Sequence, residues 1–174
     1  MILLLLVVVA GVWALLWWRG VLLPSWVVWN DKLEATDGGG TDVVESVVLK
    51  EKSLVVYSAG SEVYRSPSDW KVQDALWCDI NGDETKEVLM LAWVKDKGGA
   101  AVTGLTTEGG PGYSQHLYVF DGARTGMNPV FSSAPLLMEA VSLQADNAGR
   151  LIISEPLGKQ TLWSWSGGVF EPAK

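Results

Sequence analysis

WCDINGDETKEVLMLAW (residues 77–93) places an acidic turn between two apolar segments that have the composition of β-strands. Four side chains of this turn carry oxygen atoms that can bind a cation: Asp79, Asn81, Asp83 and Glu87. The turn is either an Asn-Gly hairpin whose charges face water, or a loop that wraps around a hard cation. Both interpretations predict two antiparallel strands joined by a tight turn.

The spacing within the turn favours the cation. Counted from Asp79, oxygen-bearing residues stand at positions one, three, five, seven and nine, the seventh being Thr85. Calcium takes about six to eight oxygen ligands, and alternate side chains with a backbone carbonyl at position seven let a loop curl around one ion. Gly82 permits a left-handed backbone inside this loop. Zinc or copper would prefer His or thiolate ligands, and only Cys78 is near, so calcium fits better.

The segment DINGDETKEV (residues 79–88) resembles the loop of the FG-GAP and VCBS-type repeats, the calcium-binding blades of integrin alpha-chain propellers. The repeat pattern is Asp-x-Asn-Gly-Asp-Gly-x-x-Asp-Leu, and the direct matches are Asp79, Asn81, Gly82 and Asp83. Glu87 replaces the usual ligand Asp, Val88 starts the next strand, and Glu84 stands where the family commonly has Gly. The resemblance implies a Ca²⁺ site formed by the side chains of Asp79, Asn81, Asp83 and Glu87 and the backbone carbonyl of Thr85.

The chain from residue 43 onward has the pattern of an all-β domain. Short segments rich in Val, Ile, Leu, Tyr, Phe and Trp are separated by Gly, Asp, Asn, Ser and Pro. Residues 75–133 and 140–172 each follow the order strand, Asp-containing turn, apolar strand, aromatic strand and short terminal strand, and residues 53–67 resemble the second half of such a unit. We therefore expect propeller-like four-stranded antiparallel units, about three in number with the first incomplete.

The turn ADNAGRL (residues 145–151) keeps Asp146 and Asn147 but lacks the other ligand positions, so we interpret it as a metal-free copy of the acidic turn. Closed propellers have about four to eight blades. Three units therefore predict an open or compacted assembly whose edge strands are covered by another chain, by the tether or by charges. The long Gly- and Thr-rich segment 95–114 interrupts one unit and is either a solvent loop or a functional one.

The N-terminal residues are not globular in composition. Residues 2–18 form an unbroken apolar run of about 25 Å as a helix, and continuation past Arg19 to Leu23 extends it to about 30 Å, the thickness of a bilayer core. Membrane–water interfaces favour indole rings, and this region holds Trp13, Trp17, Trp18, Trp26 and Trp29. We expect an uncleaved transmembrane anchor over residues 1–29; a cleaved secretory signal and a buried globular helix are the alternatives.

A polar segment with a triple glycine, NDKLEATDGGGTD (residues 30–42), predicts a flexible tether and leaves residues 43–174 as the β-domain. Arg19 and Lys32 favour a cytoplasmic β-domain by the positive-inside rule, whereas a calcium-type turn suits a calcium-rich exterior. We expect the β-domain to be extracytoplasmic. The net charge of −7 argues against nucleic acid or anionic lipid as a partner of the β-domain.

Candidates for catalytic chemistry are few. His116 is the only histidine, and Ser114 shares its face of one strand, but the sequence identifies no acid partner. Cys78, the single cysteine, lies in an apolar strand pattern and is expected to be unreactive. We therefore expect a non-enzymatic binding or scaffold module that contacts a protein or a cell-surface polymer. The alternatives are an accessory subunit of a membrane complex held through the N-terminal helix, and a hydrolase that uses His116.

Overall fold

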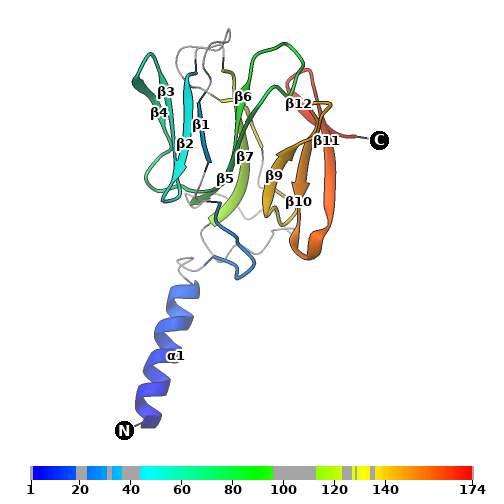
Figure 1. Ribbon diagram of the computed structural model, residues 1–174. Coiled ribbons are helices and arrows are strands. Elements are labelled where there is room, and N and C mark those ends of the chain that lie inside the picture. Colours follow the sequence, from blue (N-terminus) through cyan, green and yellow to red (C-terminus); the bar gives the residue numbers. More distant parts are fainter. Residues whose placement is uncertain are drawn as a thin grey trace.

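The protein consists mostly of β-strands, which form three four-stranded antiparallel sheets preceded by one helix (Figure 1). The computed structural model describes residues 2–18, 23–30, 33–36, 44–95, 113–122, 127, 129–133 and 136–173. Each sheet is a meander in which consecutive strands are neighbours. The expected all-β architecture of four-stranded antiparallel units is confirmed.

The N-terminal helix, α1, spans Ile2–Trp18 and contains no charged residue. The side chains of residues 5–15 are exposed; Leu5, for example, is 67% exposed and Trp13 is 61% exposed. Within the described ranges, no helix combines the length and the apolar character needed to cross a membrane. The transmembrane helix expected over residues 1–29 is therefore not supported. Residues 19–22, which would have lengthened the helix, lie outside the described part of the chain.

Residues 23–30 contact the β-domain. The backbone N–H of Asn30 donates to the carbonyl of Gln73 at 2.9 Å. The ring of Trp26 packs against that of Trp93 with 5.8 Å between centroids. The ammonium group of Lys52 lies 4.1 Å from the centre of the Trp29 ring. This segment, most of which its composition assigns to the anchor, is thus in contact with Lys52, Gln73 and Trp93 of the β-domain.

The first sheet is complete, contrary to the expectation of an incomplete first unit. Its strands are β1 (Leu33–Thr36), β2 (Ser46–Lys50), β3 (Ser53–Ser58) and β4 (Ser61–Arg65). β1 comes from the stretch whose composition predicts a tether. Its side chains alternate between half-buried and exposed, and Leu33 and Ala35 pair with Leu49 and Val47 of β2. The sequence LEAT is short, but its alternation suits an edge strand.

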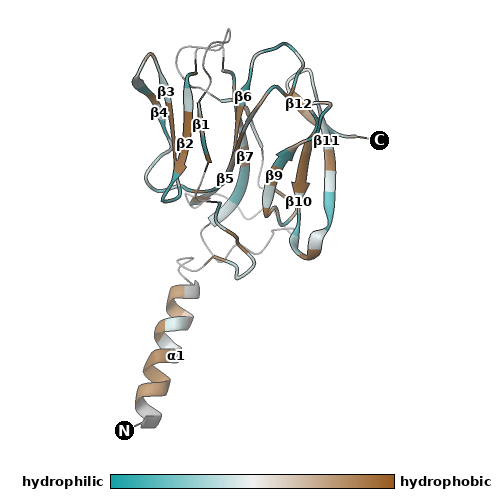
Figure 2. Cartoon of the chain, viewed as in Figure 1, coloured by the Kyte–Doolittle hydropathy of each residue, from teal (hydrophilic) through white to brown (hydrophobic). Residues whose placement is uncertain are grey.

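The second sheet lies between the other two. Its strands are β5 (Lys71–Cys78), β6 (Glu87–Lys95), β7 (Tyr113–Phe120) and β8 (Pro129–Ser132). The third sheet contains β9 (Ser142–Ala145), β10 (Leu151–Ser154), β11 (Gln160–Ser166) and β12 (Val169–Pro172), with a short 3-10 turn, η1 (Pro156–Gly158), between β10 and β11. Figure 2 shows the most hydrophobic strand residues in the interior of this stack, and α1 hydrophobic along most of its length.

Strand β6 supplies both hydrophobic cores. Val88 and Met90 point into the core between the first and second sheets. Leu89 and Leu91 point into the core between the second and third sheets. All four side chains have no exposed surface. A continuous apolar run such as VLMLAW is typical of a strand that is buried on both faces.

Strand β5 joins the second sheet to the third. A register shift lies between Val72 and Asp74, and the side chains at this place contact β9 and the chain that precedes it. The amide of Gln73 donates to the carbonyl of Ala140 at 3.0 Å and accepts from the indole N–H of Trp93 at 2.7 Å. The carboxylate of Asp74 accepts from the backbone N–H of Leu143 at 2.6 Å. These buried polar groups hold the two sheets in one arrangement.

Candidate functional site

Asp79 organises the acidic turn between β5 and β6. Its Oδ1 accepts the backbone N–H groups of Asn81 at 3.2 Å and Gly82 at 2.6 Å. Its Oδ2 accepts the N–H of Glu84 at 3.0 Å. A carboxylate with this bonding pattern closes the loop on itself, as Asx turns do. The turn is therefore formed by its own side chains, and Asp79 is the residue on which its backbone depends.

Glu84 keeps the tight turn although it replaces the Gly of the family pattern. Its φ is 69°, and that of Gly82 is 78°, so two residues of the turn have a left-handed backbone. Glycine has no Cβ and accepts this conformation freely, whereas other residues lose about 1–2 kcal/mol in it. The departure at Glu84 therefore changes the stability of the turn and not its path.

Asn81 lies between two carboxylates. Its Nδ2 donates to Oδ2 of Asp83 at 3.0 Å and to Oε1 of Glu87 at 2.9 Å. The other oxygen of Glu87 accepts the N–H of Ile80 at 3.0 Å. The backbone N–H of Thr85 donates to Asp83 at 2.8 Å. The structure thus brings Asn81, Asp83 and Glu87 into direct contact, with the positive end of an amide dipole between the two acids.

The two acids that contact Asn81 have opposite pKa shifts. Burial raises the pKa of Glu87 to about 7, and the nearby charges of Asp83 and Asp79 add to the rise. Glu87 is only 4% exposed. The pKa of Asp83 is lowered, first by the hydrogen bond from the backbone of Thr85 and then by that from Asn81. Glu87 is therefore a buried carboxyl group in a negative environment, which an added cation would stabilise in its charged form.

The donor chemistry of the turn fits a hard divalent cation. Three carboxylates and one carboxamide belong to this one turn, and oxygen donors of this kind suit calcium. Among the described residues, however, no group of three or more Asp, Glu, His or Cys side chains is arranged as metal ligands. The residues that would hold the ion are those predicted from the sequence: Asp79, Asn81, Asp83, Thr85 and Glu87. The chemistry that calcium would supply is structural, because it would neutralise and fix the turn.

In the corresponding turn of the third sheet, an arginine side chain supplies the positive charge. Asp146 follows β9 as Asp79 follows β5, and its Oδ1 accepts the N–H groups of Ala148 and Arg150, each at 2.9 Å. The guanidinium of Arg150 donates from Nε to Oδ2 of Asp146 at 2.8 Å. This ion pair supports the interpretation of residues 145–151 as a metal-free copy. The sequence did not predict it, although the four-residue spacing of Asp and Arg was visible.

The two turns lie against each other. A Cβ on Gly149, whose φ is 75°, would stand 3.1 Å from the backbone carbonyl oxygen of Asp79.

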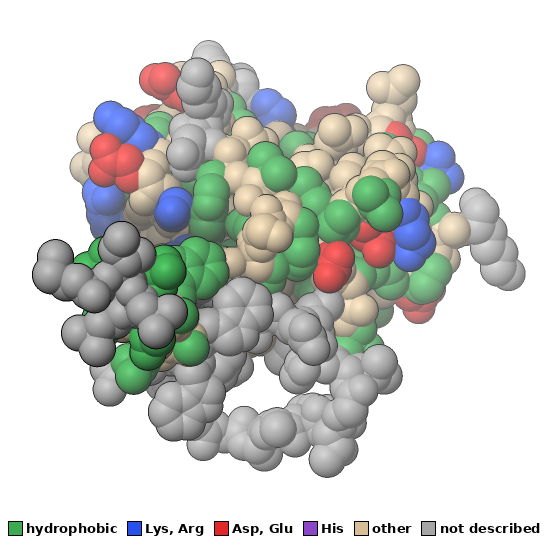
Figure 3. Space-filling model, turned by 90° about the horizontal axis from the view of Figure 1, so that it is seen from below, with side chains coloured by type: hydrophobic (Ala, Val, Ile, Leu, Met, Phe, Trp, Pro, Cys, Tyr) green, Lys and Arg blue, Asp and Glu red, His purple; other side chains and the backbone are tan. Residues whose placement is uncertain are grey.

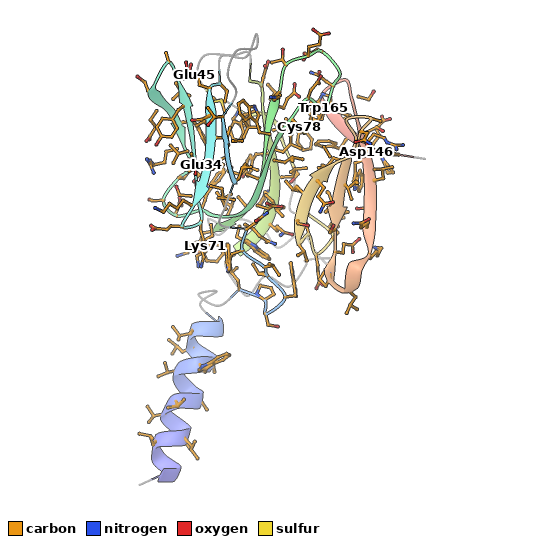
Figure 4. All side chains as sticks on the ribbon, in the orientation of Figure 1. Glu34, Glu45, Lys71, Cys78, Asp146 and Trp165 are labelled. Atoms are coloured by element: carbon orange, nitrogen blue, oxygen red, sulfur yellow. The ribbon has the colours of Figure 1, made fainter. Side chains whose placement is uncertain are left out.

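Figure 4 places Cys78, next to the acidic turn, at the end of β5 that lies opposite Lys71. Burial and the charges of Glu87 and Asp79 raise the pKa of the Cys78 thiol to about 12. The thiol stays protonated, which agrees with the expectation that it is unreactive.

Ser114 and His116 meet on β7, as their spacing predicted. The Ser114 hydroxyl is 2.8 Å from Nε2 of His116, and Nδ1 of His116 is 3.0 Å from the carbonyl oxygen of Ser133. A carbonyl can only accept, so Nδ1 carries a proton, and in a neutral imidazole Nε2 would then accept from the serine hydroxyl. This is the arrangement of a nucleophile and its base. Where a catalytic triad has an acid, His116 meets the backbone carbonyl of Ser133. This explains why no acid partner could be identified from the sequence.

The Gly- and Thr-rich segment connects β6 to β7, and residues 96–112 of it lie outside the described part of the chain. No protein-family profile matches the chain, and a comparison with curated proteins finds no matching sequence. The assignment of a function therefore rests on the sites described above.

Proposed function

We propose that the chain is a membrane-attached binding or scaffold module with three propeller-like blades, in which calcium rigidifies the turn between β5 and β6. The observation that carries the calcium assignment is the position of Asn81, whose uncharged amide meets both Asp83 and Glu87. In the third sheet a guanidinium meets the corresponding Asp146. A calcium ion would give the acidic turn the positive charge that Arg150 gives its copy.

Membrane attachment is supported by the surface of α1. The five consecutive residues from Leu5 to Val9 are each at least 53% exposed. Because successive residues of a helix are rotated by about 100°, these side chains cover its whole circumference. An apolar surface of this kind is unfavourable in water and indicates burial against lipid or another protein. We place the β-domain outside the cytoplasm, where calcium is available, and its partner is a protein or a surface polymer.

Thermal unfolding of the full chain in detergent, with calcium or with chelator, tests the calcium assignment. Calcium at about a hundred times its dissociation constant adds about 2.7 kcal/mol of stability, which corresponds to roughly 5–10 °C for a chain of this size. The shift is expected to disappear in a variant that combines Asp79→Ala with Asp83→Ala. The matched control is Asp146→Ala, which removes the acid of the other turn and is expected to keep the shift. An unchanged midpoint in the parent chain would leave the turn as an acidic hairpin.

Flotation tests the attachment. The full chain is expected to float with neutral vesicles, and a chain that starts at residue 23 is expected to remain in the dense fraction. If the full chain floats only when other membrane proteins are present, α1 packs against their helices. The accessory-subunit alternative then replaces direct attachment to lipid.

A hydrolase is the second candidate, favoured by the 2.8 Å contact between Ser114 and His116. A fluorophosphonate probe reacts with a serine hydroxyl that is activated by a base. Labelling that is lost in both Ser114→Ala and His116→Ala, with unchanged unfolding midpoints, would establish an enzyme. A binding module is expected to show no labelling in any of the three proteins.

A further inference from the structure

The end of the domain nearest α1 contains a basic pocket. It is a cavity of about 450 Å³ between the β2–β3 turn and the connection from β4 to β5. Three cationic side chains line it: Lys52, Arg65 and Lys71. Figure 4 shows Lys71 at the lower end of β5, on the side of the domain that faces α1. Such a concentration of positive charge is unexpected in a protein with a net charge of −7.

Backbone contacts fix two of these cations close together. The β2–β3 turn has a left-handed backbone at both Glu51 (φ 52°) and Lys52 (φ 63°). The carbonyl of Lys52 accepts the backbone N–H of Val72 at 2.9 Å, which ties the turn to the start of β5. Lys71 precedes Val72. Burial lowers the pKa of Lys71, and the charge of Lys52 lowers it further. The fold therefore holds two like charges together.

The protein does little to neutralise this pair. Within the described ranges, neither Lys52 nor Lys71 has an ion pair with a carboxylate. Each ammonium group lies over an aromatic ring instead: Lys52 at 4.1 Å from the centre of Trp29, and Lys71 at 4.7 Å from that of Tyr113. Cation–π contacts orient a cation while its charge remains available to an anion.

The other lining groups suit a small polar ligand. Arg65 is held by Glu62, whose carboxylate accepts from its Nε at 2.9 Å. Ser66 lies on the wall, where its hydroxyl accepts the N–H of Leu54 at 3.1 Å. Trp70 forms an apolar wall and stacks on Tyr118 with 4.6 Å between centroids. The exposed Glu51 also borders the pocket. Its carboxylate would repel an anionic ligand and so disfavours ligands of high negative charge.

We propose that this pocket binds a phosphate group, carried either by the headgroup of an anionic phospholipid or by a soluble phosphate ester. Ammonium and guanidinium groups form charge-assisted hydrogen bonds with phosphate oxygens, and the cavity has the size of a site for a small molecule. Figure 3 views the domain from the side of α1 and shows Lys and Arg side chains, with Asp and Glu side chains among them, at the side of this face where the first sheet lies. A lipid at the surface of the membrane that holds α1 would meet this face first.

The lipid source rests on the proposed membrane attachment, but the phosphate site does not. The first measurement therefore uses the full chain in uncharged detergent and inorganic phosphate as the probe, with calorimetry at constant ionic strength. Lys71→Gln and Lys52→Gln are each expected to weaken phosphate binding by about tenfold, since each removes a charge-assisted hydrogen bond. Lys71→Arg keeps the charge and is expected to keep the binding.

The matched control is Lys159→Gln, which removes the same charge from the loop between β10 and β11, outside the pocket. It is expected to change the affinity by no more than about twofold, as surface substitutions do. If the parent chain does not bind phosphate, or if Lys159→Gln weakens binding as much as Lys71→Gln, the pocket is not a phosphate site. Circular dichroism of each variant shows whether a loss reflects unfolding.

The second measurement separates the two sources of phosphate. The full chain is placed in nanodiscs of phosphatidylcholine, alone or mixed with phosphatidylglycerol, and inorganic phosphate is titrated again. A lipid headgroup in the pocket would weaken phosphate binding in the mixed discs only, and Lys71→Gln would abolish the difference. Equal binding in both discs identifies a soluble phosphate ester as the ligand. A chain that does not enter nanodiscs contradicts the membrane attachment and leaves the detergent result in place.

Discussion

Asp74 is the residue whose substitution most directly tests how the second and third sheets are held together. It is 1% exposed, and its carboxylate accepts three hydrogen bonds from three parts of the chain. The donors are the N–H of Leu143 at 2.6 Å, Nδ2 of Asn30 at 2.7 Å and the N–H of Ala75 at 2.9 Å. Burial raises the pKa of Asp74 against the effect of these bonds, which lower it. Burial therefore destabilises the charged form of Asp74, and the three hydrogen bonds compensate for this cost.

The substitution Asp74→Asn removes one acceptor while it keeps the shape. An amide oxygen in place of Oδ1 still serves Asn30 and Ala75, but the NH₂ group then faces the N–H of Leu143. A buried donor left without a partner costs about 1–3 kcal/mol. We expect a loss of about 2 kcal/mol at pH 7, which lowers the unfolding midpoint by roughly 4–8 °C. Asp69→Asn changes the same charge at an exposed loop and is expected to stay within about 0.5 kcal/mol of the parent.

Urea unfolding of the full chain in detergent measures the free energy, and hydrogen exchange measures the amide of Leu143. Faster exchange at Leu143, together with the loss of stability, would show that Asp74 holds β9 to β5. A variant with the stability of the parent chain and unchanged exchange at Leu143 would refute the reasoning. In that case the Gln73 network alone would account for the junction.

Three further substitutions test the turns. Glu84→Gly relieves about 1–2 kcal/mol of left-handed strain and loses about 0.4–1 kcal/mol because the unfolded chain gains entropy. Urea unfolding is therefore expected to show a gain in stability of up to about 1.6 kcal/mol; a loss of stability would contradict the strain at φ 69°. Glu87 has a folded pKa of about 7, raised from 4.5, so its contribution is fully present below about pH 4.5 and is lost as the pH rises to about 7. In chelator, the free energy of unfolding of the parent chain is expected to fall by on the order of 2–3 kcal/mol over this pH interval, and that of Glu87→Gln is expected to fall much less. If the two proteins show the same dependence of stability on pH, the raised pKa of Glu87 is disproved. Gly122→Ala would place a Cβ against the carbonyl oxygen of Lys86, closer than van der Waals contact allows, and is expected to cost about 3 kcal/mol or more by overpacking, whereas Gly11→Ala, with open space around it, is expected to leave the midpoint of the β-domain unchanged.

The fold was predictable from the sequence where hydrophobic patterns and turns agree. The run VLMLAW of β6 predicted an apolar strand, and the recurrence of strand and turn predicted about three units. Strand β1 was missed because its four residues stand next to a triple glycine, and local composition indicated a tether. Its place depends on pairing with Leu49 and Val47, which are more than ten residues away.

The candidate sites, too, were predictable from the sequence only in part. Ser114 and His116 were predictable as neighbours because the two-residue period of a strand fixes their common face. The pair of Asp146 and Arg150 depends on the conformation of its turn, which the sequence did not specify. The basic pocket was not predictable at all. Lys52, Arg65 and Lys71 belong to three separate segments, and only the alignment of the strand ends brings them together.

The two proposed sites lie at opposite ends of the same strand, and this placement links them. β5 begins at Lys71 in the basic pocket and ends at Cys78, directly before Asp79 of the acidic turn. A strand of this length spans about 25 Å, well beyond the range of about 7–10 Å within which substitutions usually couple. The phosphate affinity is therefore expected to be the same with calcium and with chelator. The charge arrangement also gives the domain a direction, because the basic pocket, where we propose a phosphate site, lies toward α1, and the acidic turn, where we propose a calcium site, lies away from it. A domain held at a membrane by α1 would turn its basic end to the lipid and leave its acidic turn in the solution where calcium is found.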